Sequence, residues 1–263
     1  PLVRESYSSP IETFKTNVIG TANVLEAARY TENVKAIINV TTDKCYENLE
    51  QISPYQENDR LGGYDPYSSS KACAELVSTA YRKSFFNKCG INLATVRGGN
   101  VIGGGDWARD RLIPDFFRAL NAGKSLQIRS PNAIRPWQHV LEPISGYLML
   151  AEKLVIDGNN YAEAWNFGPD ESKARSVSQI IKHLSSSFKG SSWNIENTPQ
   201  LHEAGLLKID SSKAKSRLGW IHQWNLETAL NKTIDWYQVW CSRGDLMFIT
   251  NAQIDAYEKK IKK

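Results

Sequence analysis

Two residues at helical spacing have side chains suited to proton transfer on an alcohol or a sugar. Tyr67 and Lys71 stand four residues apart, so on a helix they share one face. An ammonium beside a phenol favours the phenolate and lowers a phenol pKa that starts at about 10. We therefore predict that Tyr67 acts as a base on a hydroxyl and that Lys71 supports it and donates to a ribose diol.

A second group of reactive side chains is the run Thr41-Thr42-Asp43-Lys44. An elimination needs one group that takes a proton and another that protonates the leaving hydroxyl, and Asp43 and Lys44 offer both. On an extended chain end these neighbours would point in different directions. Thr42 adds a hydroxyl that can polarise a substrate oxygen. Alone, an Asp-Lys dipeptide is usually a solvated loop charge, so the prediction depends on the base tyrosine nearby.

Strands and helices alternate around these residues, which favours an α/β fold with a parallel sheet. The two strand segments are β-branched and apolar, as in buried parallel strands. The first helix has apolar residues at steps of three and four, and the second begins after Pro66. The predicted strands are 34–40 and 91–96, and the predicted helices are 11–30 and 67–88.

The carboxyl ends of parallel strands are where ligands bind in open sheets. Residues 41–44 follow one strand and Asn100 follows the other, so the site is expected there. The glycine run 103–105 comes next, and composition alone leaves it either a flexible crossover or a loop folded over a ligand. In the second case Arg109 and Arg111 would be available for a diphosphate.

The pattern loosens after residue 100, which indicates a smaller mixed α/β cap. We predict a partial Rossmann-type doubly wound parallel sheet over 1–100 and a substrate-binding cap over 101–263, with 135–170 returning to the sheet. Within the cap, Arg129 and Arg135 could add charge-assisted bonds to phosphate. The expected cap helices are 112–122, 142–154, 177–188, 210–218 and 226–242, and the expected strands are 127–129 and 165–167.

Composition is that of an ordinary soluble globular protein, with 263 residues, 41% hydrophobic and 23% charged. The net charge of +4 is scattered, and the lysines of 259–263 are expected at a solvated helix end rather than on nucleic acid. No apolar run approaches the roughly 20 residues of a membrane span. The four cysteines form no metal motif and favour reduced thiols in the cytoplasm. His139 and His202 are predicted to be structural.

Taken together, these motifs resemble the extended short-chain dehydrogenases that act on nucleotide sugars. Residues 17–21 (NVIGT) and 165–169 (WNFGP) fit that family too. Its epimerases usually have small residues or hydroxyls where this chain has Asp43-Lys44, and its dTDP-glucose dehydratases have Asp-Glu. Asp-Lys is similar to the CDP-glucose 4,6-dehydratases. The resemblance runs from about residue 1 to residue 257, and also includes 97–115, 134–140, 207–210 and 217–220.

The resemblance implies NAD as cofactor and CDP-glucose, or a similar nucleotide sugar, as substrate. Tyr67 would take the proton of the sugar 4-hydroxyl while NAD⁺ accepts the hydride from C4. Lys44 would take the C5 proton and Asp43 would protonate the departing 6-hydroxyl, or these two roles could be exchanged. The hydride then returns to C6, giving a 4-keto-6-deoxy sugar without net redox change.

Further roles are implied by the same resemblance. Thr41, Tyr67 and Lys71 would contact the cofactor. A homodimer would form through the helices at 11–30 and 67–88, and the product would enter deoxysugar and lipopolysaccharide O-antigen biosynthesis. Asn100 would bind the diphosphate or the sugar of the substrate, and Arg135 is the best candidate for a further phosphate contact. Arg109, Arg111 and Arg129 join them as substrate-binding candidates on the charge argument given above.

One departure from the family pattern keeps alternatives open. Family members begin with a strand and a glycine-rich phosphate loop, which we expect ahead of Pro1 in a longer protein. A related epimerase or decarboxylase is one alternative, and the Asp43-Lys44 pair argues against it. A non-catalytic module that binds only the sugar nucleotide is the other, and the lack of a glycine loop in these 263 residues favours it.

Overall fold

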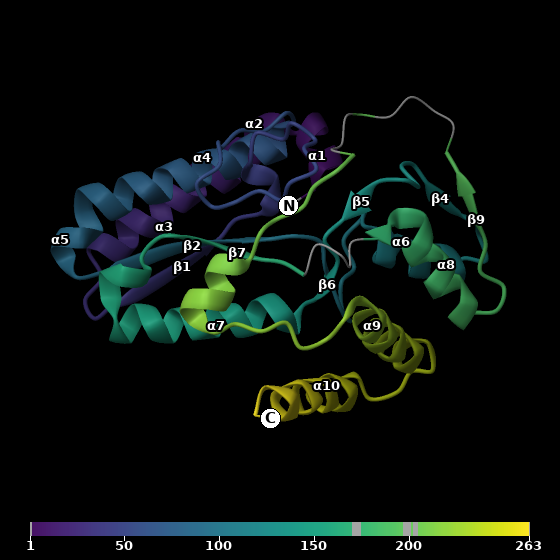
Figure 1. Ribbon diagram of the computed structural model, residues 1–263. Helices are drawn as coiled ribbons and strands as arrows, with labels where there is room; N and C mark the ends of the chain where they lie inside the picture. The colour runs from purple at the N-terminus through teal and green to yellow at the C-terminus, as the bar shows by residue number, and fades with distance from the viewer. Residues whose placement is uncertain (1, 170–174, 197–200, 202–204, 263) are drawn as a thin grey trace.

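The computed structural model describes residues 2–169, 175–196, 201 and 205–262. Three parallel strands form the main sheet in the order β1-β2-β7, with helices on both faces (Figure 1). Helices α3 and α4 lie above the sheet in that view and α7 lies below it. The predicted doubly wound, Rossmann-type arrangement is confirmed. These elements are β1 Ala36–Val40, β2 Asn92–Gly98, β7 Ala164–Phe167, α3 Gly20–Arg29, α4 Pro66–Tyr81 and α7 Leu141–Ile156.

The middle strand β2 is the buried one. It pairs in parallel with β1, with Asn92 opposite Ala36 and Val96 opposite Val40. On its other side it pairs in parallel with β7. The prediction that the first strand is buried was wrong, because β1 is half-buried and Val40 is 49% exposed. The physical reason is that β1 lies at an edge of this three-stranded sheet.

Helix α4 starts where the sequence predicts. Asp65 is its N-cap and accepts bonds from the backbone N–H and the hydroxyl of Ser68, and Pro66 takes the first helical position. The helix continues through a π-helical turn at Arg82–Phe86 and the short α5, Asn87–Cys89. These details hold Tyr67 at the first turn of the helix, next to the strand ends.

A second long helical stretch packs against α4. It consists of α2 (Pro10–Phe14), a π-helical turn (Lys15–Ile19) and α3, after a short α1 (Val3–Ser8). Of the apolar stripe predicted for this stretch, only Leu25 is buried, whereas Ile11 is exposed. The helix therefore rests on α4 through part of its apolar surface and leaves the rest on the outside.

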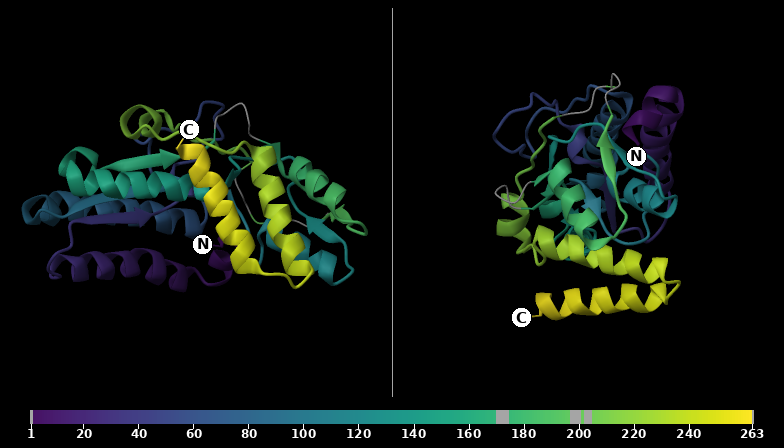
Figure 2. Two further views of the ribbon diagram at one scale, coloured as in Figure 1. Left: turned by 90° about the horizontal axis from the view of Figure 1, so that it is seen from below. Right: turned by 90° about the vertical axis from the view of Figure 1, so that its right-hand side faces the viewer.

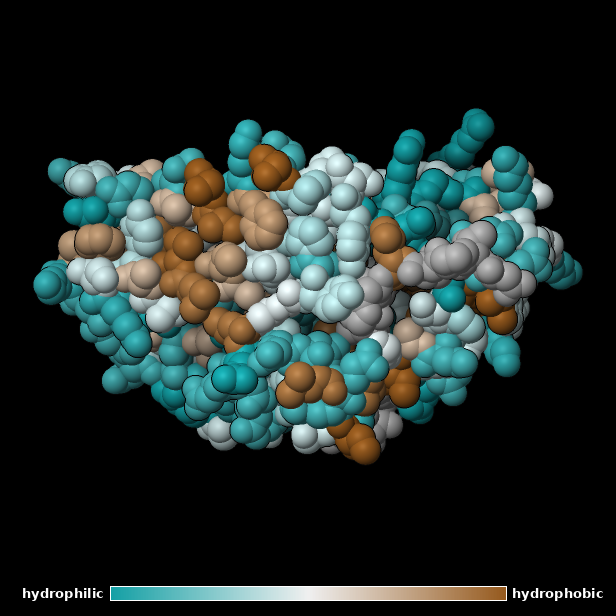
Figure 3. All heavy atoms as spheres, turned by 90° about the horizontal axis from the view of Figure 1, so that it is seen from above, coloured by the Kyte–Doolittle hydropathy of each residue, from teal (hydrophilic) through white to brown (hydrophobic). Residues whose placement is uncertain are grey.

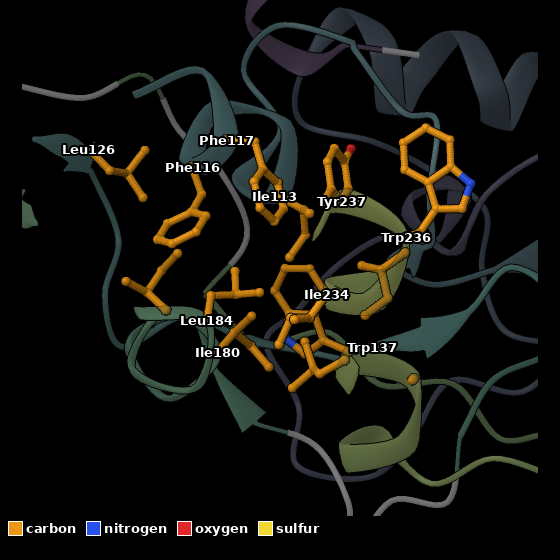
Figure 4. Packing of buried hydrophobic residues seen from close by; sticks show 14 of the residues in the cluster. Ile113, Phe116, Phe117, Leu126, Trp137, Ile180, Leu184, Ile234, Trp236 and Tyr237 are labelled. Atoms are coloured by element: carbon orange, nitrogen blue, oxygen red, sulfur yellow. The ribbon is translucent and has the colours of Figure 1, made fainter. Parts of the chain in front are cut away.

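The cap joins short strand pairs to helices. Its core, shown in Figure 4, packs Phe116 and Phe117 against Tyr237, Ile180 and Leu184. Strands β3, β4 and β5 pair with β6, β9 and β8, respectively. The cap strands are β3 Val101–Ile102, β4 Leu126–Ile128, β5 Ile134–Arg135, β6 Gln138–His139, β8 Arg175–Ser176 and β9 Trp193–Ile195. The cap helices are α6 Leu112–Asn121, α8 Val177–Ser187, α9 Leu226–Cys241 and α10 Leu246–Ile261.

The last helix, α10, is an element that the sequence prediction missed. It runs back alongside α9 (Figure 2), and Lys259 and Lys260 stand in its last turn. The basic run is thus a helix end, as expected. Near residue 214 the predicted helix is mainly a π-helical turn, Ala214–Leu218. No helix in the described part of the chain is both long and apolar enough to cross a bilayer.

Candidate functional site

A cleft of about 1230 Å³ opens at the carboxyl ends of β1 and β2, where the sheet meets the cap. Most of the predicted site residues line it, from the strand ends, from α4 and from the cap. Two do not: Lys71 lies on α4 just outside it, and Arg109 is exposed on the loop before α6. The lining residues among those predicted are Thr41, Thr42, Asp43, Lys44, Tyr67, Asn100, Arg111, Arg129 and Arg135.

The chain turns sharply after β1, contrary to the prediction of an extended end. Asp43–Cys45 form a 3₁₀ turn capped by Thr42, whose hydroxyl accepts the backbone N–H of Lys44. The turn brings Nζ of Lys44 within 3.4 Å of Oδ1 of Asp43. The two side chains therefore point to one place instead of diverging, and together they form an ion pair.

Asp43 is the almost fully buried member of this pair. Its Oδ1 accepts both the Lys44 ammonium and the hydroxyl of Thr42. Its Oδ2 is buried and has no hydrogen-bond partner among the described residues, and the same holds for Oδ1 of Asn100. Buried oxygens without a donor are unusual, so both atoms are suited to hydroxyl or amide donors of a ligand.

The phenol of Tyr67 lies near the side chain of Thr42. Burial, with a smaller contribution from the nearby Asp43, raises the pKa of Tyr67 to about 12, although Thr42 and Arg111 act to lower it. The predicted lowering of this pKa by Lys71 was wrong for this structure. The Lys71 ammonium instead donates to the carbonyl of Val40, at 3.2 Å, and burial lowers its own pKa.

A buried ion pair beneath the site was missed by sequence reasoning. Arg97 on β2 contacts Glu75 on α4 through two bonds, Nε to Oε1 at 3.0 Å and Nη2 to Oε2 at 2.8 Å. The same carboxylate accepts the hydroxyls of Thr41 and Thr95. Burial acts to raise the pKa of Glu75, but Arg97 outweighs it and the pKa is lowered. Glu75 lies on α4 eight residues after Tyr67. This spacing is the feature of the sequence from which Glu75 could have been predicted as part of the site.

The glycine-rich loop after β2 is fastened to the cap. A Cβ at Gly104 would lie 2.1 Å from ring atoms of Trp236, so only glycine allows this approach. Tyr237 donates to the backbone carbonyl of Asp106 at 2.7 Å. Asp106 in turn bonds Arg111, which lines the cleft. The loop is therefore a packed wall of the site, rather than the flexible crossover that composition also allowed.

Several cations surround the mouth of the cleft. Arg4 on α1 and Arg129 on the cap both contact Asp110, at 3.1 and 3.5 Å. Arg135 is buried and donates to the carbonyls of Ile134 and Gly205. Sequence reasoning identified Arg129 and Arg135 but missed Arg4, because the first helix was not predicted. The cationic lining fits an anionic ligand.

The histidines lie outside this chemistry. His139 is buried, does not line the cleft, and its Nδ1 accepts the backbone N–H of Leu141. Burial lowers the pKa of His139 to about 4, so the ring is neutral at neutral pH. This agrees with the structural role predicted for it, although Nε2 has no partner among the described residues. His202 lies outside the described residues. No His, Cys, Asp or Glu cluster in the described chain could hold a metal ion.

Comparisons with known proteins show the family of this chain. The family model for GDP-mannose 4,6 dehydratase matches residues 1–233. A CDP-glucose 4,6-dehydratase of Salmonella typhimurium is 47% identical over 98% of this chain and 73% of its own length. A trifunctional UDP-glucose 4,6-dehydratase of Arabidopsis thaliana is 28% identical over 89% of this chain, but only 34% of that larger protein is covered.

The fold itself is shared with solved structures. A dTDP-glucose 4,6-dehydratase of Streptomyces venezuelae, solved with NAD bound, has a TM-score of 0.76 at 22% identity, covering 90% of this chain and 70% of the other. At that identity the likeness shows the Rossmann-type fold. The family match spans most of the chain, and the Salmonella relative matches nearly all of it. This chain therefore belongs to the GDP-mannose 4,6 dehydratase family of nucleotide-sugar 4,6-dehydratases.

Proposed function

We propose that this chain catalyses the NAD-dependent dehydration of CDP-D-glucose to CDP-4-keto-6-deoxy-D-glucose. The observation that carries the proposal is the Asp43–Lys44 pair, which shares one cleft with Tyr67 and is bonded to Thr42 through Asp43. The Salmonella typhimurium relative, itself a CDP-glucose 4,6-dehydratase, supports the choice of sugar nucleotide.

Tyr67 removes the proton from the sugar 4-hydroxyl, and the side chain of Thr42 lies near the same phenol. Because burial raises the pKa of Tyr67 to about 12, a cation beside the phenol is needed to make the phenolate accessible. Lys71 shares a helix face with Tyr67 and is suited to this role. It would act once its ammonium shifts from the Val40 carbonyl towards the phenol.

The residues around Tyr67 fit a nicotinamide cofactor. An ammonium has three donors, and Lys71 uses one of them on Val40, which leaves two for a ribose diol. The Thr41 hydroxyl donates to Glu75 and its backbone N–H donates to Val96, so Thr41 would contact the cofactor through its backbone carbonyl. NAD⁺, when bound, accepts the hydride from C4 and returns it to C6. The described residues supply the proton transfers.

Asp43 and Lys44 carry the loss of water. The new 4-ketone acidifies the proton on C5, which Lys44 takes. Asp43 gives its proton to the oxygen on C6, the C6–O bond breaks, water leaves, and a C5–C6 double bond forms. Lys44 then returns a proton to C5. The reverse assignment, with Asp43 as base and Lys44 as acid, balances the same step. Measuring C5 proton exchange and release of water in variants of each residue distinguishes the two assignments.

The sugar nucleotide is held by the cap side of the cleft. Arg111, Arg129 and Arg135 provide charge for the diphosphate, and the unpartnered Oδ1 of Asn100 accepts a donor of the substrate. Arg109 is left out, because it is exposed and does not line the cleft. We assign the sheet side, residues 1–100, to the cofactor and most of 101–263 to the sugar nucleotide.

The helices beside α4 support a homodimer. Apolar side chains gather on the half of the molecule that holds α2, α3 and α4 (Figure 3). Two copies that pair these helices would cover this surface and form a four-helix bundle. The exposed apolar side chains on it include Ile11, Ile19, Val24 and Tyr30.

We place the enzyme in the cytoplasm and its product in deoxysugar biosynthesis for lipopolysaccharide. Its four free thiols fit a reducing compartment. A nucleotide-linked 4-keto-6-deoxy sugar is a reactive intermediate, which a reductase, epimerase or aminotransferase would consume.

The decisive experiment is an assay of the full-length protein with CDP-glucose, dTDP-glucose and UDP-glucose. We expect a product with the alkaline absorbance of a 4-keto sugar, formed fastest from CDP-glucose. Formation of a 4-epimer without that absorbance would identify an epimerase and overturn the proposal. Calorimetry with CDP and with NAD⁺ tests the non-catalytic alternative, since CDP binding without NAD⁺ binding would favour a sugar-nucleotide module.

A further inference from the structure

Tyr147 reaches the cleft from α7, on the face of the sheet opposite to α4. Its ring packs edge-on against Phe167, with centroids 5.4 Å apart and planes at 81°. A Cβ built on Gly98 would lie 3.2 Å from the Tyr147 hydroxyl. The side chain is therefore held at the end of β2 by its ring, and the absence of a side chain at residue 98 makes room for its hydroxyl.

The acid of the proposed reaction follows the adjoining strand end. The backbone N–H of Thr41 donates to the carbonyl of Val96 at 2.8 Å, so the turn that holds Asp43 and the residue Gly98, where the Tyr147 hydroxyl lies, continue from neighbouring strands. Burial raises the pKa of Tyr147, and the negative charge of Asp43 acts in the same direction. Both residues line the same cleft. The reaction steps described above assign Tyr147 no role.

Asp43 has a bonding pattern that leaves one oxygen free. Oδ1 accepts Thr42 and Lys44, whereas Oδ2 is buried without a partner among the described residues. Two donors on Oδ1 leave no lone pair there for an acidic proton, so the proton that Asp43 delivers must sit on Oδ2. An atom that carries the transferred proton needs a partner to fix its direction.

We propose that Tyr147 is a positioning residue for the loss of water: when the sugar nucleotide is bound, its hydroxyl donates to Oδ2 of Asp43 and directs that oxygen to the departing 6-hydroxyl. A phenol suits this task because its O–H can donate to Oδ2 in both protonation states of Asp43, which leaves the Oδ2 proton free to point at the leaving oxygen. The inference rests on the proposed function. Tyr147 acts through Asp43 and takes no proton from the substrate.

The test is Tyr147→Phe in the full-length enzyme, because this change removes the hydroxyl and keeps the ring on Phe167. We expect kcat for CDP-glucose to fall about 10- to 100-fold, the loss expected for a hydrogen bond to a charged group, while KM changes by less than about threefold. Single-turnover absorbance should show reduced nicotinamide appearing at the normal rate and then accumulating. Deuterium exchange at C5 should continue.

Tyr161→Phe is the matched control. Its hydroxyl donates to the carbonyl of Arg217 and does not line the cleft, so both kcat and the nicotinamide signal should stay normal. A normal kcat in Tyr147→Phe would overturn the inference, as would a loss confined to the first appearance of reduced nicotinamide. If the unsubstituted enzyme fails to convert CDP-glucose, the proposed function fails first, so the two failures are distinguishable.

Discussion

The ammonium of Lys44 and the carboxylate of Asp43 are in contact at 3.4 Å although the two residues are neighbours in sequence. The 3₁₀ turn after β1 makes this contact possible. The carboxylate side chain is 1% exposed and the lysine side chain 26%, so the pair has a buried end and a solvent-facing end. The more accessible group is suited to exchanging a proton with C5, and the buried one to protecting a proton for the leaving oxygen.

Separate substitutions of this pair should stop the reaction at different points. In Lys44→Met we expect the C4 oxidation to proceed, seen as reduced nicotinamide absorbance, while deuterium exchange at C5 is lost. In Asp43→Asn we expect C5 exchange to persist while release of water stops. Each change should lower kcat by about 10²- to 10⁴-fold, the usual contribution of a general acid or base.

Lys88→Met, in α5 and away from the cleft, is the control for loss of a lysine and should leave all three partial reactions intact. If Asp43→Asn abolishes C5 exchange and Lys44→Met retains it, the two roles are exchanged. Retention of full turnover in both variants would contradict the assignment of this pair to the elimination.

Glu75→Gln should destabilise the protein strongly. The substitution leaves the Arg97 guanidinium buried without its carboxylate, and breaking a buried pair in this way costs about 3–5 kcal/mol. Urea unfolding measures the loss. Glu152→Gln, on the exposed face of α7, is the matched control and should change the free energy of unfolding by less than about 0.5 kcal/mol. Equal, small effects in both variants would contradict a structural role for the pair.

The elements that hold the site could be predicted because their signals are local. The β-branched runs gave β1 and β2, and Pro66 with helical periodicity gave α4. Spacing on that helix and position after a strand then pointed to Tyr67 and Asp43, which the structure brings into one cleft.

The features that were missed depend on contacts between distant parts of the chain. The Glu75–Arg97 pair joins a helix to a strand 22 residues later, and Arg4 meets Asp110 across 106 residues. The pKa of Tyr67 was predicted with the wrong sign because sequence spacing shows a possible partner but not the depth of burial. Helix α10 was missed, and only its basic end stood out in the sequence.

Stability should fall as the pH drops below about 6.5. Burial lowers the pKa of His139 from 6.5 to about 4, so the unfolded chain binds a proton that the folded one does not across this range. The stabilisation is complete above 6.5 and is lost towards pH 4, with about 2 kcal/mol lost by pH 5. His139→Asn, whose Oδ1 can accept the Leu141 N–H, should show a smaller loss between pH 7.5 and pH 5 in urea unfolding. His183→Asn, at a half-buried position on α8 where the ring bonds Asn231, is the control and should lose as much as the unsubstituted protein. An unchanged loss in His139→Asn would contradict the prediction.

A charge on the apolar face of α3 should separate the proposed dimer. Val24 is 65% exposed on this helix and does not line the cleft. Burying a new carboxylate between two copies without a partner is costly, so Val24→Asp should sediment as a monomer at concentrations where the unsubstituted protein is a dimer. Val155→Asp makes the same substitution at an exposed position of α7, beneath the sheet, and should remain dimeric. A monomeric unsubstituted protein, or a Val24→Asp dimer as stable as the original, would rule out pairing through α3 and α4.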